Sequence, residues 1–96
     1  MASPSLFWGS FVFDSAAIES VNDLKGVAQA QMEAIGLSNA TIHQFDVNGS
    51  TSDTIVAVTF VAQGAHRWTA IVMAAGVHAH TLRDQLIAKF KAVSFL

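Results

Sequence analysis

The chain contains no cysteine and only one proline, Pro4. The absence of cysteine excludes disulfide bonds, thiolate metal ligands and a cysteine nucleophile, and it fits a reducing compartment, so we expect a cytoplasmic protein. The apolar run at 6–13 has no Lys or Arg before it, unlike a secretory signal, and the apolar run at 68–79 is too short to span a bilayer. We therefore expect neither a targeting segment nor a membrane as a partner.

Charged residues are also scarce, at 12% of the chain, whereas hydrophobic residues make up 52%. A soluble domain has about 25% charged residues, so part of the apolar surface is expected to face another subunit or a ligand. Seven acidic and five basic residues give a net charge of −2. Because the basic residues are scattered, the chain lacks the dense basic face that nucleic-acid binding requires.

At 96 residues the chain is one domain, which we place at 6–96 after a flexible tail at 1–5. A domain of this size buries only about 64% of its unfolded surface, so a second copy would add to its stability. Hydrophobic periodicity predicts four strands and two helices in the order β-α-β-β-β-α. The predicted strands cover 6–13, 40–47, 53–63 and 66–74, the predicted helices cover about 15–35 and 81–93, and the polar segment 48–53 is a predicted turn.

Local signals mark the ends of the predicted helices. Asp14 and Ser15 are typical N-cap residues for the first helix, and Gly36 supplies a left-handed C-terminal cap. Thr81, with Asp84 three residues later, matches a capping box at the start of the second helix. Both helices thus have a defined start, and the first also has a defined end.

Alternation along the strands places apolar side chains on both of their faces. In the first strand, phenylalanines occupy one face while Leu6, Trp8 and Val12 occupy the other, and the strands at 53–63 and 66–74 have no polar face either. Two helices can cover one face only, so we expect a two-layer α+β sandwich: a mostly antiparallel four-stranded sheet with both helices on one face. The open face is expected to pack on the same face of a second copy, which makes a homodimer the first hypothesis for the assembly.

Histidine is the only residue type here with obvious catalytic or metal chemistry, and it occurs as His43, His66, His78 and His80. His78 and His80 would point to the same side of an extended segment, a spacing used in metal sites. No acid lies between Asp53 and Asp84 to complete a ligand set, and serine-nucleophile motifs and phosphate-binding glycine loops are absent. The sequence therefore indicates no metal, no cofactor and no defined catalytic residues.

Aromatic and basic residues indicate where a ligand would bind. Arg67 and Trp68 follow His66 at a predicted strand start, where guanidinium hydrogen bonds and stacking would hold an anionic or aromatic molecule. The same residues also suit a purely structural strand end. With aromatic and thioether residues of neighbouring strands they define a candidate ligand-binding set of Trp8, Phe11, Phe60, His66, Arg67, Trp68 and Met73.

Three functions fit these observations. The first is a non-enzymatic interaction module that self-associates through an apolar sheet face. The alternative is a small-molecule binding protein with an apolar, aromatic-lined cavity, and the third, which the sequence favours least, is a small histidine-dependent enzyme. Under the first hypothesis, Val58→Asp or Trp68→Asp is expected to dissociate or unfold the protein.

Overall fold

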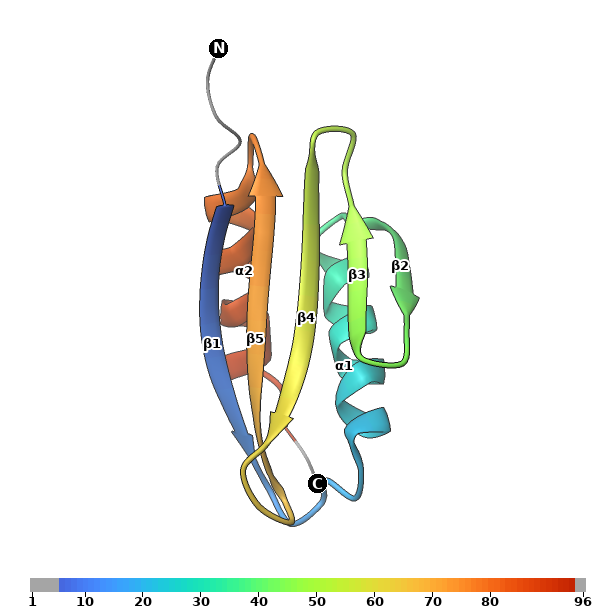
Figure 1. Ribbon diagram of the computed structural model, residues 1–96, viewed down its shortest axis with the longest axis vertical. Coiled ribbons are helices and arrows are strands. Elements are labelled where there is room, and N and C mark those ends of the chain that lie inside the picture. Colours follow the sequence, from blue (N-terminus) through green and yellow to red (C-terminus); the bar gives the residue numbers. More distant parts are fainter. Residues whose placement is uncertain (1–5, 95–96) are drawn as a thin grey trace.

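The computed structural model describes residues 6–94, which form one five-stranded antiparallel sheet and two helices (Figure 1). The tail that the sequence predicts at 1–5 lies outside the described residues. The strand order in the sheet is β1-β5-β4-β3-β2, so the first strand lies at an edge beside the last. Along the chain the elements are β1 (Leu6–Asp14), α1 (Val21–Ala34), β2 (Ser38–Ile42), β3 (Asp46–Ser50), β4 (Thr54–Ala62), β5 (Arg67–Gly76) and α2 (Ala79–Lys91).

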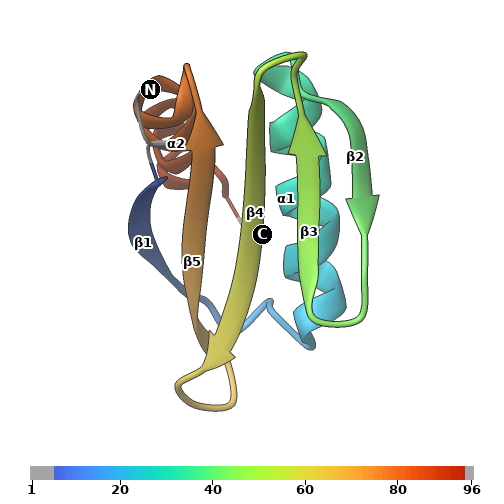
Figure 2. The same cartoon turned by 45° about the horizontal axis from the view of Figure 1, so that its top comes forward.

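Both helices lie on the same side of the sheet (Figures 1 and 2). α2 packs on β1 and β5, and α1 packs on β2 and β3. Within residues 6–94, no element covers the other side of the sheet. The α+β class with an antiparallel sheet is thereby confirmed. The largest fully buried side chains between the layers are Phe90, Ile18, Leu24, Met32 and Leu86.

The register of the three long strands shows which residues share a face. Met73 of β5 is paired with Trp8 of β1 on one side and with Ala57 of β4 on the other. Their side chains therefore project from the same side of the sheet. On the opposite side, Phe13 of β1 is 3% exposed and Val58 of β4 is fully buried beneath the helices. The alternation predicted for these strands is confirmed.

The sheet has five strands where the sequence predicts four. A turn at 43–45 divides the predicted strand at 40–47 into β2 and β3. Lys25 of α1 holds this turn, since its Nζ donates hydrogen bonds to the carbonyl oxygens of His43 (3.0 Å) and Gln44 (2.5 Å). The contact joins residues distant in sequence, so strand periodicity gives no sign of it. The element order is β-α-β-β-β-β-α.

The polar segment 48–53, predicted as a turn, belongs to β3 as far as Ser50. Gly49 is buried at this point, and a Cβ on it would lie 3.2 Å from Leu37 Cβ. Glycine here allows the chain that follows α1 to approach the strand closely. The turn itself is restricted to 51–53.

α1 begins later than the sequence predicts. Asp14 ends β1, and Ser15 continues the ladder with a hydrogen bond from its N–H to His66 O (3.1 Å). The N-cap is Ser20, which forms a capping box with Asp23. The serine side chain accepts a hydrogen bond from a backbone N–H of the first turn, and Asp23 Oδ2 accepts a hydrogen bond from Ser20 N (3.2 Å). The predicted N-cap at Asp14 and Ser15 is wrong because both residues take part in the β1–β5 ladder.

α2 begins at Ala79, with His78 as its N-cap residue. The His78 side chain makes no capping hydrogen bond, and Thr81 already lies inside the helix. The capping box predicted for Thr81 and Asp84 is therefore wrong, because the turn after β5 starts the helix before it reaches Thr81.

The end of α1 agrees with the sequence prediction. Gly36 has a φ of +90°, and the N–H groups of Gly36 and Leu37 donate to the carbonyl oxygens of Glu33 (3.1 Å) and Met32 (3.0 Å). This is a Schellman motif, and the buried side chains of Leu37 and Met32 add the apolar contact that commonly accompanies it. Among the described residues, no helix has the length and apolar character needed to cross a membrane.

Candidate functional site

The side of the sheet opposite the helices is apolar across three neighbouring strands. Leu6 and Trp8 of β1 are 68% and 67% exposed, and Ile55 of β4 is 61% exposed. Soluble proteins rarely leave so much contiguous apolar surface in water unless it binds something. We call this surface the open sheet face, and it comprises Leu6, Trp8, Ser10, Val12, Ile55, Ala57, Thr59, Val61, Thr69, Ile71, Met73 and Ala75.

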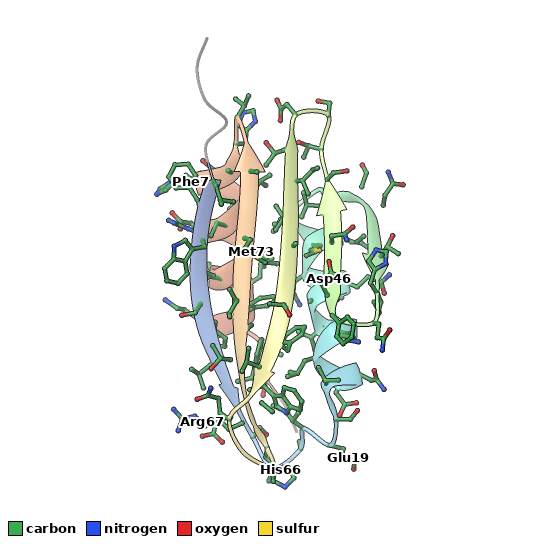
Figure 3. All side chains as sticks on the ribbon, viewed as in Figure 1. Phe7, Glu19, Asp46, His66, Arg67 and Met73 are labelled. Carbon is green, nitrogen blue, oxygen red and sulfur yellow. The ribbon has the colours of Figure 1, made fainter. Side chains whose placement is uncertain are left out.

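The middle of the open sheet face is a row of cross-strand neighbours. Met73, which Figure 3 labels midway along β5, lies between Trp8 and Ala57 in the register. Cross-strand pairs of this kind bring side chains into contact, so the indole, the thioether and the methyl group form a continuous apolar strip. The thioether of methionine adapts its shape to whatever packs against it.

Polar side chains border the open sheet face on two sides. β3 contributes Asp46 and Asn48, which are joined by a hydrogen bond from Asn48 Nδ2 to Asp46 Oδ2 (3.1 Å). At the end of the face, Asp14 of β1 is paired with Arg67 of β5, and Figure 3 labels Asp46 and Arg67 at these positions. An apolar centre with a polar rim is the composition typical of protein–protein interfaces.

The structure divides the predicted ligand-binding residues between the two sides of the sheet. Trp8 and Met73 belong to the open sheet face, with Arg67 at its end. His66 lies in the β4–β5 turn, where its Nδ1 is 2.7 Å from Ile18 O and ties this turn to the segment before α1. These four residues do not share a cavity with the rest of the set.

Phe11, Phe60 and Trp68 lie on the helix side of the sheet and pack against the core. Phe13 is paired with Trp68, and its ring contacts the Phe90 ring edge to face, with 5.2 Å between centroids. Trp68 Nε1 is buried and has no hydrogen-bond partner within residues 6–94. A buried polar group without a partner is uncommon, and within residues 6–94 it distinguishes this aromatic cluster of Phe11, Phe60 and Trp68 from the rest of the core.

His78 and His80 do not come together as the metal pair that their spacing allows. His78 Nδ1 lies 3.3 Å from Asp53 Oδ1, whereas His80 Nε2 lies 3.5 Å from Asp84 Oδ2. His78 precedes α2 and His80 lies in its first turn, so the extended geometry that would align them is lost. Within the part of the chain that the structure describes, no three His, Asp or Glu side chains converge as metal ligands.

The pair formed by Asp53 and His78 is an arrangement that the sequence does not reveal. Asp53 Oδ1 also accepts hydrogen bonds from the hydroxyl groups of Thr51 and Thr54, both at 3.0 Å. The hydrogen bond from His78, followed by those from the two threonines, lowers the pKa of Asp53.

A shallow hollow adjoins this pair, and it is lined by Thr51, Ser52, Asp53, His78, Thr81, Leu82 and Gln85. The lining adds hydroxyl and amide groups, but Asp53 and His78 are its only titratable residues. The His78 side chain is 60% exposed, so the pair is open to water.

Comparison with known proteins assigns no family to the chain. No family model, no curated protein and no solved structure matches it. The function is therefore interpreted from the geometry of the open sheet face, the aromatic cluster and the Asp53–His78 pair.

Proposed function

We propose that the chain is a non-enzymatic interaction module that forms a homodimer by packing the open sheet faces of two copies together. The observation that carries this proposal is the exposure of Leu6, Trp8 and Ile55 on one continuous apolar face. Because both copies use the same face, the contact is isologous and closes at two subunits. The low charge content of the chain is consistent with a surface that is covered in the assembly.

The size of the open sheet face supports a protein partner. Strands of nine residues are about 30 Å long, and three strands span roughly 15 Å, so the face covers on the order of 450 Å² in projection. The relief of the side chains and the bordering strand β3 increase this area toward the roughly 800 Å² that each partner contributes to a standard interface. Two sheets packed face to face lie about 10 Å apart, which accommodates one interdigitated layer of these side chains.

Matched valine substitutions test the dimer. Val61 is 44% exposed on the open sheet face, whereas Val77 is 77% exposed in the loop between β5 and α2. Val61→Asp is expected to raise the dimer Kd by about 100-fold or more, because each dimer would bury two unpaired carboxylates. Val77→Asp is expected to leave Kd unchanged. Sedimentation equilibrium measures Kd, and circular dichroism shows whether each variant is folded.

Two results would overturn the dimer. One is a wild-type chain that sediments as a monomer at every accessible concentration, and the other is a folded Val61→Asp variant with an unchanged Kd. Charges at Val58 or Trp68 would not serve this test, because both side chains lie on the helix side of the sheet. A carboxylate there is expected to unfold the single copy, which gives no information about the open sheet face.

The second candidate function is binding of a small apolar molecule by the aromatic cluster of Phe11, Phe60 and Trp68. The buried Nε1 of Trp68, which lacks a partner within residues 6–94, supports it, since a ligand with one acceptor would satisfy this donor. Native mass spectrometry of protein purified without added ligand separates the two functions. A bare dimer supports the interaction module, whereas an extra mass on each subunit supports ligand binding.

A further inference from the structure

β1 is an edge strand, so half of its backbone N–H and C=O groups have no neighbouring strand to bond to. The hydrogen bond from Ser15 N to His66 O shows which half this is. Residues of an antiparallel ladder alternate between bonding to the neighbouring strand and pointing away from it. Ser15 continues the β1–β5 register, so the odd-numbered residues of β1 bond to β5. The N–H and C=O groups of the even-numbered residues, Trp8 and Ser10 among them, therefore point to the open edge.

Such an edge is a template for another strand. β1 has nine residues, includes neither proline nor lysine, and pairs with β5 without a bulge. Two copies of β1 aligned antiparallel about their central Ser10 place Trp8 opposite Val12 of the second copy. Even-numbered residues then meet even-numbered residues, which keeps the apolar side chains of both copies on one side of the joined sheet. β1 of a second copy is therefore the strand that this edge fits.

Arg83 of α2 occupies this edge. Its Nη1 donates a hydrogen bond to Trp8 O (3.1 Å), one of the outward-pointing carbonyl groups. Its Nε and Nη2 both donate to Asp84 Oδ1, at 3.0 Å and 2.8 Å, and its guanidinium carbon lies 5.7 Å from the centre of the Phe7 ring. The Arg83 side chain is only 20% exposed. These contacts hold the guanidinium against β1 instead of leaving it extended into water.

Gly9 leaves the space that this arrangement requires. A Cβ on Gly9 would lie 2.8 Å from Ile87 Cδ1 and 3.3 Å from Arg83 Cδ. A larger residue would displace both side chains of α2 from β1. The absence of a side chain at Gly9 thus allows the Arg83 side chain to pack against β1 at this edge.

We propose that the β1 edge is a second self-association surface, which fits β1 of another copy, and that Arg83 keeps it closed. A strand that pairs with β1 needs Trp8 O as a hydrogen-bond acceptor, and it needs the space beside this oxygen. Arg83 donates to Trp8 O and occupies that space. The proposal does not rest on the open sheet face, because edge pairing extends the sheet in its own plane, whereas face packing stacks two sheets. When both surfaces are available, the chain can form assemblies larger than a dimer.

Removal of the guanidinium tests this proposal. Arg83→Met removes the donors and keeps much of the aliphatic stem, and Lys91→Met, an exposed residue on the same helix, is the control for the loss of one positive charge. In sedimentation velocity, we expect Arg83→Met to form species with about twice as many subunits as the wild type, or more. We expect Lys91→Met to sediment like the wild type. Hydrogen exchange should show new protection of the Trp8 and Ser10 amides in the Arg83→Met assembly.

A second substitution identifies the strand that pairs. Ser10→Pro removes an outward-pointing N–H without removing a β1–β5 hydrogen bond, so Arg83→Met combined with Ser10→Pro is expected to return to the wild-type size. If circular dichroism shows that Arg83→Met does not fold, Arg83→Lys replaces it, because lysine keeps the charge but loses the fork that binds Asp84. A smaller shift in the same direction is then expected.

Two outcomes overturn the proposal: a folded Arg83 variant that keeps the wild-type size, or a larger assembly that Ser10→Pro does not reverse. A monomeric wild type would overturn only the dimer formed by the open sheet face. The Arg83 comparison remains valid in that case, since the size of each variant is compared with the wild type under the same conditions.

Discussion

Asp53 and His78 are 25 residues apart in the chain, yet Asp53 Oδ1 lies 3.3 Å from His78 Nδ1. The contact follows from the β4–β5 register, in which Thr54 is paired with Gly76, so the residues just beyond this pair meet. Thr54, which is 2% exposed, links them: its hydroxyl donates to Asp53 Oδ1 (3.0 Å) and accepts from His78 N (3.0 Å). The N-cap residue of α2 is thereby tied to the beginning of β4.

Loss of the Asp53 carboxylate is expected to reduce the acid sensitivity of the fold. The pKa of Asp53 is lowered below its ordinary value of 3.8, first by the hydrogen bond from His78 and then by those from Thr54 and Thr51. Because the pKa is lower in the folded state than in the unfolded state, the carboxylate stabilises the fold above the unfolded pKa, and this contribution is lost as pH falls through the folded pKa. Asp53→Asn should therefore show a smaller drop in Tm than the wild type between neutral pH and about pH 3.

Thermal melts followed by circular dichroism at the two pH values measure this difference. Glu33→Gln, which removes an exposed carboxylate from α1, is the control and should retain the wild-type drop in Tm. Equal drops for Asp53→Asn and the wild type would show that the Asp53–His78 pair does not contribute to stability.

Two glycine substitutions are expected to act in opposite directions. Gly76 has a φ of +130°, and a Cβ on it would lie 2.1 Å from Asp53 O, so Gly76→Ala should destabilise the protein by about 2 kcal/mol or more. A Cβ on Gly26 would meet nothing within 4 Å, so Gly26→Ala in the exposed middle of α1 should stabilise it by about 1 kcal/mol. Urea unfolding gives both values, and a neutral Gly76→Ala would contradict the close contact between the ends of β4 and β5.

Lys25 is expected to contribute through its hydrogen bonds. The Lys25 side chain reaches the carbonyl oxygens of His43 and Gln44, and the residue is only 7% exposed. Lys25→Met keeps the apolar stem but leaves these acceptors without their donor, which should cost about 1–3 kcal/mol. Lys89→Met, on the exposed side of α2, is the control and should change stability by less than about 0.5 kcal/mol. A Lys25→Met variant as stable as this control would mean that water replaces the ammonium group.

Strict alternation made the long strands predictable from sequence. In β1, β4 and β5 the two-residue period identifies which side chains, such as Trp8 and Met73, leave the core, and it therefore locates the open sheet face. Gly36 was predictable for a similar reason, because a left-handed cap is a local property of the backbone. The predicted ligand-binding set was less accurate. It grouped Trp8 with Trp68 because both are tryptophans, although the alternation of side chains along the strands places them on opposite sides of the sheet.

Long-range contacts set the features that the sequence did not predict. The division of 40–47 into two strands depends on Lys25, and the late start of α1 depends on the bond between Ser15 and His66 O. The Asp53–His78 pair likewise arises only once β4 and β5 are in register. Each of these contacts joins segments whose relative position is decided by the sheet, so periodicity within one segment cannot reveal it.

The two candidate capping residues can be compared directly. Ser20 accepts from the first turn of α1 and forms a capping box with Asp23, whereas Thr81 lies inside α2. Ser20→Ala should therefore destabilise the protein by about 1 kcal/mol, while Thr81→Ala should be neutral or slightly stabilising because alanine has the higher helix propensity. Both values come from urea unfolding monitored by circular dichroism. A larger loss of stability for Thr81→Ala than for Ser20→Ala would contradict this structure. It would indicate that α2 starts at the capping box that the sequence predicts, and in that case His78 would not be held beside Asp53.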